Sequence, residues 1–439
     1  MLRRLPPSLV VIAVPILVLA LPKREPSLSD RVERFLSPLV ASRDFSGVIL
    51  VSRGDTVLVR QAYGMADFEF GVPVTTGTRF RIASITKTFT GAAVAMLAQG
   101  GKLSLQDSLS KFLPDFPKGE KIQIRHLLLH ESGVGNPDSE PCDAVTLEEL
   151  VAQIAAKPLA FSPGTNSRYS NGGYALLARV IEKATGRRWE EFLREEIFRP
   201  LSLTATRVDD PESLLPKRAR GFAPAPREHE LINAPCSSAQ GAIGSGALVS
   251  TADDLRRWAR AVRNEKLFRR SALEHPYGWG VRSYDGRRAI EQSGIVNGAI
   301  SYLAIYLDDD VAVVVLSNVQ SGLGEQIGKA IGRLAFGLDP PRIDPSPAGQ
   351  SSTARERRDW LGQYRNANIG SFRLVDRNDA LYQVWGDSRH GSYLRSTGPD
   401  SCFNAQDSAQ MQVVRDPAGR VMAIRISFGG SSLQAFERE

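Results

Sequence analysis

Two pairs of short apolar segments in this chain have the pattern of β-hairpins. Residues 48–51 and 57–59 are runs of mainly branched aliphatic side chains on either side of Arg53-Gly54-Asp55, a sequence that favours a tight turn. Residues 302–306 and 311–315 repeat the pattern around three consecutive aspartates. The Arg-Gly-Asp tripeptide also matches a cell-adhesion motif, but its place between two predicted strands favours a turn. If both hairpins join one antiparallel sheet, the two ends of this region lie close together.

The region between the two hairpins is predicted to be mainly helical. Residues 84–99 contain the helix-forming residues Ala, Met and Leu, and the glycine pair that follows ends the helix. In residues 173–184 apolar side chains recur at helical spacing, and Gly186 follows as the terminator. Further helices are predicted to start near residue 27, to run from residue 188 to before Pro200, to follow the capping pair Ser250-Thr251, and to cover residues 325–336.

The C-terminal part of the chain reads as a separate unit. Four prolines between residues 340 and 347 mark a stiff linker. Short alternating segments then follow, such as 372–375 and 381–385, which predict a small barrel or sandwich. The predicted fold class is α+β, an antiparallel sheet flanked by helices with a small all-β C-terminal domain. The predicted divisions are 27–338 for the main domain, 339–354 for the Pro-rich linker and 355–439 for the β-rich domain.

Residues 1–22 have the layout of a secretory signal. Arg3 and Arg4 precede an apolar stretch from Leu9 to Leu21, and Val18-Leu19-Ala20 resembles a cleavage site. The stretch is shorter than the roughly 20 residues of a membrane-spanning helix. The bulky Leu19 leaves both a cleaved signal peptide and an uncleaved signal anchor open. Export to the periplasm or the extracellular space is predicted, with membrane association through this segment if it is retained.

Composition excludes some classes of function. Hydrophobic residues make up 42% and charged residues 23% of the chain, as in soluble globular proteins. The net charge is +7, but Lys and Arg are scattered and no basic run alternates with aromatic residues, so nucleic-acid binding is not expected. Cys142, Cys236 and Cys402 form no C-x-x-C motif. A disulfide between Cys142 and Cys236 and three free thiols are both open.

Histidine spacing offers one candidate metal site. His126 and His130 stand four residues apart and can share a helix face. No third histidine or set of carboxylates stands nearby in the sequence. We therefore expect no metal ion and no cofactor.

The tetrapeptide Ser84-Ile85-Thr86-Lys87 carries the strongest candidate chemistry. Residues three apart on a helix lie on one face, so the amine of Lys87 is placed beside the hydroxyl of Ser84. A serine hydroxyl becomes a good nucleophile when a neighbouring base takes its proton. Alone, this short motif is too common to identify an enzyme. Tyr169 and Asn171 strengthen it: a tyrosinate is a base if cations lower its pKa from about 10, and an amide can bind both a substrate carbonyl and Lys87.

Together these motifs resemble the serine β-lactamases and penicillin-binding proteins, in the branch of class C β-lactamases, D-alanyl-D-alanine carboxypeptidases and esterases. The resemblance implies that Ser84 is acylated, that Lys87 and Tyr169 manage its proton, and that Asn171 positions the substrate. It also implies that the oxyanion lies between the Ser84 N–H and a backbone N–H of the strand with the third motif. The resemblance runs from about Phe45 to Asn318 and includes, in family order, residues 80–87, 124–133, 169–174, 198–201 and 244–254.

The third motif departs from the family pattern. Gln292-Ser293-Gly294 stands where the family has K-T-G or H-x-G, and all three residues are predicted to line the substrate site. Gly294 allows close backbone approach, and Ser293 can hydrogen-bond. Gln292 is neutral, so carboxylate-bearing substrates such as penicillins or D-Ala-D-Ala peptides are expected to bind less well, and the pKa of Tyr169 to be lowered less. The smaller lowering of the Tyr169 pKa favours activated esters or weak general hydrolysis.

The sequence therefore predicts an exported serine hydrolase that forms an acyl-enzyme through Ser84. Its expected substrates are small molecules or peptides with an amide, ester or β-lactam bond, peptidoglycan-derived peptides among them. The alternative is a sensor or scaffold of the same fold without turnover, and Gln292 is the evidence for it. An α/β-hydrolase is disfavoured because the chain has no G-x-S-x-G motif. The segment 222–236 is predicted to form a loop over the site.

Overall fold

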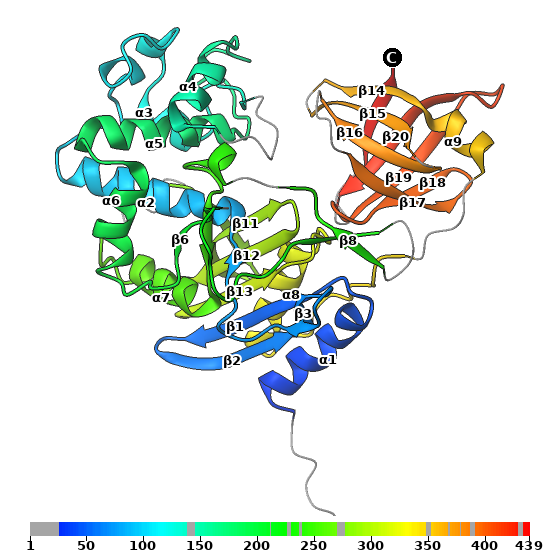
Figure 1. The fold of residues 1–439 in the computed structure, drawn as a ribbon, viewed down its shortest axis with the longest axis horizontal. Coiled ribbons are helices and arrows are strands. Elements are labelled where there is room, and N and C mark those ends of the chain that lie inside the picture. The colour runs from blue at the N-terminus through cyan, green and yellow to red at the C-terminus, as the bar shows by residue number, and fades with distance from the viewer. Residues whose placement is uncertain are drawn as a thin grey trace, which may run out of the picture.

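A six-stranded antiparallel sheet forms the centre of the molecule in the computed structural model (Figure 1). The structure describes residues 26–137, 145–210, 212–225, 230–236, 239–269, 277–347, 353–367, 369–377, 379–386, 391–428 and 433–439. The strands of the sheet lie in the order β10 (Gly280–Tyr284), β11 (Arg287–Val296), β12 (Ala299–Tyr306), β13 (Val311–Ser317), β1 (Gly47–Arg53) and β2 (Thr56–Tyr63).

The two predicted hairpins, β1–β2 and β12–β13, are confirmed, and they join in this sheet. Strand β1 pairs with β13 from Gly47 opposite Ser317 to Arg53 opposite Val311, so segments about 260 residues apart in the chain lie side by side. Side chains alternate along β1, because successive residues of a strand point to opposite faces. Val48 and Leu50 therefore enter one hydrophobic core, and Ile49 and Val51 enter the other.

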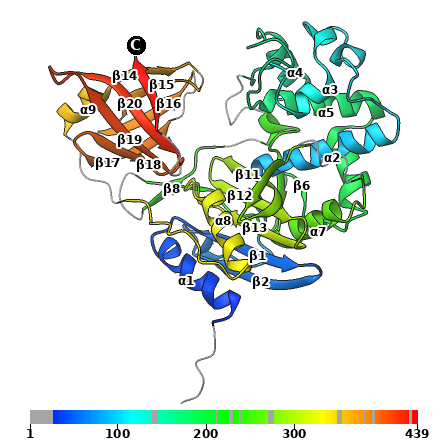
Figure 2. The same ribbon diagram turned by 180° about the vertical axis from the view of Figure 1, so that it is seen from behind.

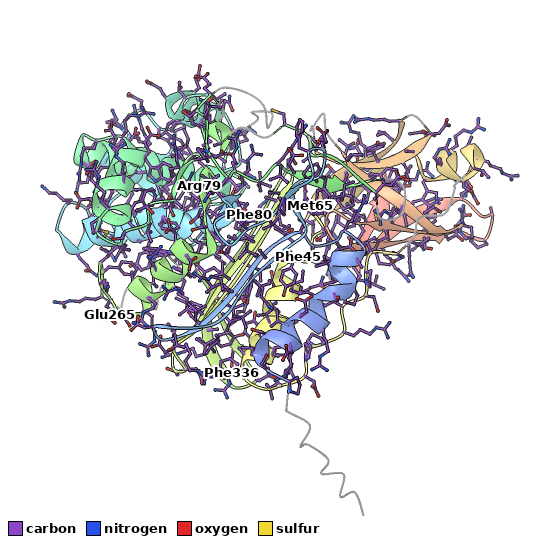
Figure 3. All side chains as sticks on the ribbon, turned by 60° about the horizontal axis from the view of Figure 1, so that its bottom comes forward. Phe45, Met65, Arg79, Phe80, Glu265 and Phe336 are labelled. Atoms are coloured by element: carbon purple, nitrogen blue, oxygen red, sulfur yellow. The ribbon has the colours of Figure 1, made fainter. Side chains whose placement is uncertain are left out.

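Two helices cover one face of the sheet. These are α1 (Leu28–Ala41), capped by Ser27, and α8 (Gly324–Ala335). Figure 3 shows Phe45 and Phe336 on this side of the sheet and Phe80 toward the opposite side, as the two cores require.

A larger helical layer covers the other face (Figure 2). Its central helix α2 (Thr86–Gln99) is buried on nearly all sides, which explains its apolar composition all round. The predicted start at residue 84 is wrong by two residues, because residues 83–85 form a separate 3₁₀ turn, η1 (Ala83–Ile85). Around α2 lie α3 (Ile124–Leu128), α4 (Leu147–Ala155), α5 (Asn171–Thr185), α6 (Trp189–Leu193), which continues as the π-helical turn η4 (Arg194–Phe198), and α7 (Ala252–Arg263), which Thr251 caps.

Short elements connect these layers. The strands β5 (Phe80–Arg81), β6 (Arg207–Val208) and β9 (Leu248–Ser250) form a small sheet beside η1, and β3 (Met65–Asp67) pairs with β4 (Val72–Pro73). Part of the segment predicted as a loop over the site forms the hairpin β7 (Phe222–Pro224) and β8 (Leu231–Asn233). The remaining 3₁₀ turns are η2 (Leu109–Lys111), η3 (Gly119–Lys121) and η5 (Gln240–Ala242).

The C-terminal residues form a closed barrel, which decides between the predicted barrel and sandwich and confirms the α+β fold class with an all-β C-terminal domain. Its interior is packed with side chains such as Phe372, Met411 and Phe436, and closure leaves no unpaired strand edge. After helix α9 (Ala354–Trp360), the strands are β14 (Gly362–Asn366), β15 (Gly370–Arg377), β16 (Ala380–Trp385), β17 (Ser392–Gly398), β18 (Ser401–Asn404), β19 (Ala409–Arg415), β20 (Val421–Phe428) and β21 (Gln434–Arg438), which returns to pair with β14.

The barrel is fixed to the rest of the molecule by buried polar contacts. Arg395, only 2% exposed, donates from Nε to the Ala225 carbonyl at 3.0 Å. Gln326 on α8 donates to Ser408 Oγ at 3.3 Å. Gly322 has a φ of +68°, and a Cβ there would lie 2.5 Å from the Ser408 nitrogen, so only glycine allows this approach. The barrel is therefore held against the β7–β8 hairpin and the N-terminal end of α8, and Figure 1 shows β8 next to it.

Several predictions fall outside the described residues. The signal segment 1–22 lies there, as do Cys142 and residues 348–352 of the predicted linker. Cys236 and Cys402 are free thiols in the described part of the chain, so the disulfide to Cys142 stays a prediction. In the ranges that the structure describes, no helix is both long enough and apolar enough to cross a bilayer.

Candidate active site

Ser84 lies in the tight turn that leads into the buried helix α2. The turn begins with Ala83 in the left-handed backbone region, at a φ of +44°. Ser84 is partly exposed, whereas Ala83 and Ile85 on either side of it are buried. Left-handed backbone at a residue other than glycine persists only where the surroundings hold it. The packing of η1 thus presents the Ser84 hydroxyl beside the N-terminal end of a helix, where backbone N–H groups carry partial positive charge.

Lys87 is enclosed in the core beside Ser84, with 1% of its surface exposed. Its Nζ lies 3.1 Å from Ser84 Oγ, 2.8 Å from Asn171 Oδ1 and 3.0 Å from the Ser245 carbonyl oxygen. Burial lowers the pKa of Lys87 well below its ordinary value of 10.5. A neutral amine has two N–H bonds, enough for the amide and carbonyl oxygens, and its lone pair then faces Ser84. Lys87 is therefore placed to accept the Ser84 proton.

Tyr169 is the second side chain that contacts the nucleophile. Its hydroxyl donates to Ser84 Oγ at 2.8 Å, and Lys87 Nζ lies 4.7 Å from the centre of its ring. Burial of the hydroxyl end raises the pKa of Tyr169 to about 12, although 51% of the whole side chain is exposed. A tyrosinate in the resting enzyme would require a lowered pKa, so this raised pKa argues against one. At neutral pH the phenol is a proton donor rather than a base.

Asn171 is the first residue of α5, and the neighbouring backbone is held by two polar side chains. Ser170 Oγ accepts from the Gly173 N–H at 3.0 Å, and Asn136 Oδ1 accepts from the Asn171 N–H at 2.7 Å. These caps leave the Asn171 side chain free to bind Lys87 through Oδ1. Its amide nitrogen has no hydrogen-bond partner among the described residues and is available to a substrate carbonyl.

His130 supports the segment that carries Tyr169. The ring centroids of the two residues lie 4.5 Å apart, and His130 Nδ1 accepts from the Ser170 N–H at 3.1 Å. Burial lowers the pKa of His130 to about 4, with a second contribution from nearby Lys87 in its protonated form, so the imidazole is neutral at neutral pH. The sequence alone did not reveal this role of His130. Its only signal was the position of His130 in the motif 124–133.

Ser245 is the other contributor that sequence reasoning missed. It acts through its backbone carbonyl, which the identity of a side chain does not reveal. The available signal was the pair of glycines on either side of it, in the motif 244–254. A Cβ at Gly244 would lie 2.3 Å from the Tyr174 carbonyl oxygen, so glycine lets this loop approach α5 and reach Lys87.

The third motif lies on β11 and only partly faces the nucleophile. A Cβ at Gly294 would lie 2.8 Å from the Ser84 nitrogen and 2.7 Å from the Ile82 oxygen, so the packing of β11 against η1 requires glycine here. Ser293 points to the other face of the sheet, where its hydroxyl donates to Glu325 on α8 at 3.3 Å. The Gln292 amide donates to the Ser293 carbonyl at 2.8 Å. The structure thus brings Gly294 to Ser84 and leaves the Ser293 hydroxyl away from it.

The structure joins Ser84, Lys87, Tyr169 and Asn171 into one hydrogen-bonded group. Within the described ranges, no group of three or more His, Cys, Asp or Glu side chains gathers in a way that suits a metal ion. His126, the partner of His130 in the metal pattern considered above, accepts through Nδ1 from the Gln123 N–H at 3.2 Å. The arrangement can transfer an acyl group to a serine, with one proton acceptor and one proton donor already in contact with it.

Comparison with known proteins agrees with this geometry. A family model described as Beta-lactamase matches residues 32–337. The chain is 25% identical to "Penicillin-binding protein 4*" of Bacillus subtilis (strain 168), over 90% of this chain and 98% of that protein. It is 27% identical to "Teichoic acid D-alanine hydrolase" of Staphylococcus aureus, over 63% of this chain and 71% of that protein.

A solved structure extends the likeness in fold to the C-terminal barrel. The octameric penicillin-binding protein homologue from Pyrococcus abyssi superposes with a TM-score of 0.63 at 22% identity. The match covers 93% of this chain and 99% of that chain, so it includes both the sheet with its helices and the barrel.

Proposed function

The chain belongs to the beta-lactamase family, and from this premise we propose that it is a serine hydrolase that forms an acyl-enzyme through Ser84. The observation that carries the proposal is the contact of Ser84 Oγ with both Lys87 Nζ and the Tyr169 hydroxyl. The buried amine is the proton acceptor, and the phenol is the proton donor. The proposed substrates are esters or amides of D-amino acids and β-lactams.

Acylation begins with proton transfer from Ser84 to Lys87. As Ser84 Oγ bonds to the substrate carbonyl carbon, its proton moves to the neutral amine, which becomes an ammonium with donors for all three of its oxygen neighbours. The carbonyl oxygen gains the negative charge and is stabilised by the Ser84 N–H together with backbone of β11 near Gly294. Asn171 donates its side-chain amide to a second carbonyl of the substrate.

Collapse of this intermediate expels the leaving group. The bond from the carbonyl carbon to the leaving oxygen or nitrogen breaks, and Tyr169 gives that atom its proton. The proton that Lys87 took from Ser84 then passes to the Tyr169 phenolate, so the amine is neutral again. Water then attacks the carbonyl carbon of the acyl-enzyme. Its proton passes by way of Lys87 and Tyr169 to Ser84 Oγ as the bond from that oxygen to the carbon breaks, which releases the acid and restores Ser84.

Esters of D-amino acids are the substrates that the neutral Gln292 favours. Its amide supplies no positive charge for a carboxylate beside the nucleophile, and an ester needs less help from the leaving-group proton donor than an amide does. The name of the Staphylococcus aureus relative describes an enzyme that removes D-alanine from teichoic acid. This relative supports an ester of D-alanine as the first substrate to test.

We extend the proposal to export of the chain, because residues 1–22 have the layout of a signal. A relative named for teichoic acid, a polymer of the cell envelope, agrees with that location.

The test uses three probes on the purified protein and on Ser84→Ala. These are a chromogenic ester of D-alanine, a chromogenic cephalosporin and a fluorescent penicillin. Turnover of the ester that disappears in Ser84→Ala supports the proposal. Stable labelling by penicillin without turnover of any probe identifies instead the sensor that the sequence left as the alternative, and ester turnover that survives in Ser84→Ala contradicts the assignment of the nucleophile.

A further inference from the structure

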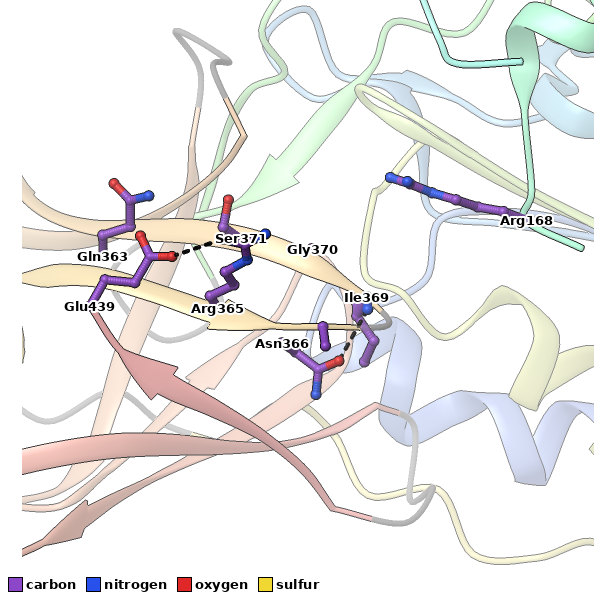
Figure 4. A pocket seen from close by; sticks show the side chains of 9 residues that line it. Arg168, Gln363, Arg365, Asn366, Ile369, Gly370, Ser371 and Glu439 are labelled. Carbon is purple, nitrogen blue, oxygen red and sulfur yellow. Dashed lines mark hydrogen bonds and ion pairs between the residues drawn. The ribbon is translucent and has the colours of Figure 1, made fainter. Parts of the chain in front are cut away.

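A polar pocket lies between the segment that carries Tyr169 and the C-terminal barrel (Figure 4). Its volume is about 460 Å³. The four side chains of the hydrogen-bonded group around Ser84 do not line it, but Arg168, the residue before Tyr169, does. The facing wall belongs to β14, β15 and the end of the chain: Gln363, Arg365, Asn366, Ile369, Ser371 and Glu439.

The charged side chains of this pocket are unevenly paired. Arg168 is exposed and makes no ion pair with any residue in the described ranges, while its backbone N–H donates to the His130 carbonyl at 2.9 Å. Arg365 pairs with Glu439 at 3.7 Å, a distance too long for a strong contact, and 70% of its side chain is exposed. Two guanidinium groups thus face one carboxylate, and Arg168 extends toward the barrel (Figure 4).

Both walls of the pocket are held in place. His130 fixes the backbone on the Arg168 side, through its own carbonyl and through Nδ1 to Ser170. The barrel is fixed by the buried Arg395 and by the contact of Gln326 with Ser408. A site between two fixed walls is preorganised, so binding costs less conformational entropy.

We infer that this pocket binds an anionic group, a carboxylate or a phosphate, carried by the leaving group of the substrate, and that Arg168 is its main partner. The inference rests on the proposed function, in which Tyr169 donates to the leaving atom. Arg168 directly precedes Tyr169 and lines the pocket, so we place the pocket on the path of a leaving group that extends past Tyr169. A guanidinium binds either a carboxylate or a phosphate through paired N–H donors. The neutral Gln292 provides no positive charge for such an anion beside Ser84.

The pocket is separate from the nucleophile, which sets the length of the substrate. A short leaving group ends before it reaches Arg168, so a minimal ester gains nothing from the pocket. A leaving group whose anion stands at the end of a chain of several bonds can reach the wall that the barrel forms. Selectivity for anions is therefore expected only for extended substrates.

The test compares three N-acetyl-D-alanyl esters whose leaving alcohols have similar length. The alcohols are 6-hydroxyhexanoate, hexane-1,6-diol monophosphate and the neutral 6-hydroxyhexanamide. Arg168→Gln is expected to lower kcat/KM for the two anionic esters about three- to ten-fold, mainly through KM, and to leave the neutral ester unchanged. The two anionic arms show which oxyanion the pocket prefers. Arg34→Gln, which removes a charge from the exposed face of α1, is the matched control.

Two results separate the failure of this inference from failure of the proposed function. If the neutral ester is hydrolysed but Arg168→Gln leaves the ratio of anionic to neutral kcat/KM unchanged, the anion pocket is wrong and the serine hydrolase stands. If no ester is hydrolysed, titration calorimetry with Ser84→Ala measures binding of the phosphate ester without turnover. The dissociation constant of the phosphate ester then rises about three- to ten-fold when Arg168→Gln is added, and an unchanged constant contradicts the inference.

Discussion

The neutral His130 is expected to make the folded protein sensitive to acid. Its pKa is about 4 in the folded state against 6.5 for an unperturbed histidine. Between these pH values His130 is protonated in the unfolded chain but not in the folded chain, so the free energy of unfolding falls as the pH falls from 6.5 to 4. At about 1.36 kcal/mol for each pH unit, the loss is at most about 3 kcal/mol, and it is complete below pH 4.

The structural cost of protonation explains this loss. Protonated His130 has no free lone pair at Nδ1, so the Ser170 N–H loses its acceptor and meets a second donor. The new charge also lies near Lys87. Acid therefore disturbs the backbone that carries Tyr169 and Asn171, and this disturbance is expected to lower activity around pH 4, where His130 of the folded protein takes up the proton.

The variant His130→Asn removes the titration. Asparagine tolerates the left-handed conformation of this position, where φ is +61°. Urea unfolding followed by tryptophan fluorescence, at steps from pH 7.5 to pH 4, gives the free energy of unfolding of both proteins. The wild type is expected to lose up to about 3 kcal/mol more than His130→Asn over this range. Ser84→Ala keeps the histidine and should follow the wild type, and equal pH dependence in the wild type and His130→Asn would refute the reasoning.

Further predictions concern the site and the barrel. Gly294→Ala places a Cβ 2.8 Å from the Ser84 nitrogen and is expected to lower kcat/KM by at least about 100-fold, with an unchanged circular dichroism spectrum. In Ser293→Ala, kcat/KM is expected to stay within about two-fold of the wild-type value, because the Ser293 hydroxyl faces α8. Tyr169→Phe is expected to lower kcat by about 10²- to 10⁴-fold, most strongly for amides, whose leaving group needs the proton; an equal loss for activated esters and amides contradicts the donor role. Gln292→Lys is expected to raise turnover of carboxylate-bearing substrates over neutral ones, and an unchanged ratio argues against the charge account. Arg395→Ala is expected to loosen the barrel, seen as faster release of the barrel from the main domain by limited proteolysis than in the wild type.

The sequence predicted the larger features of the fold because they follow from local pattern. The hairpins β1–β2 and β12–β13 were visible as apolar runs around turn residues, and the cap of α7 was visible as a threonine before an acidic first turn. Short alternating segments also indicated the all-β C-terminal unit, but not whether it closed. Closure depends on the pairing of β14 with β21, between segments about 70 residues apart, which no local pattern records.

The candidate site divides in the same way. Ser84 and Lys87 are three residues apart, so helix geometry alone placed them together. Tyr169 and Asn171 were added as a second motif with suitable side-chain chemistry, and the resemblance then implied their roles. The structure brings them to Ser84 and Lys87 across about 85 residues of sequence. The pKa of Tyr169 was not accessible in this way, because it depends on burial of its hydroxyl rather than on its neighbours in the chain.

Contacts made through backbone atoms or between domains also could not be predicted from the sequence. The carbonyl of Ser245 reaches Lys87 because Gly244 lets a distant loop approach α5. Arg168 reads as one arginine among many in a chain of net charge +7. Its place in a pocket depends on where the barrel lies. Both contacts follow from tertiary packing, which a single sequence does not specify locally.

The most direct test of the account is a search for the acyl-enzyme by intact mass spectrometry. The purified protein is mixed with a penicillin or an activated D-alanyl ester, quenched in acid within seconds, and digested to locate the adduct. The account predicts one added acyl group on the peptide that contains Ser84, and no adduct at that peptide in Ser84→Ala. Lys87→Met, which removes the proton acceptor, is expected to slow formation of the adduct by about 10²- to 10⁴-fold. An adduct at another residue, or hydrolysis at the wild-type rate in Ser84→Ala, would contradict the central claim.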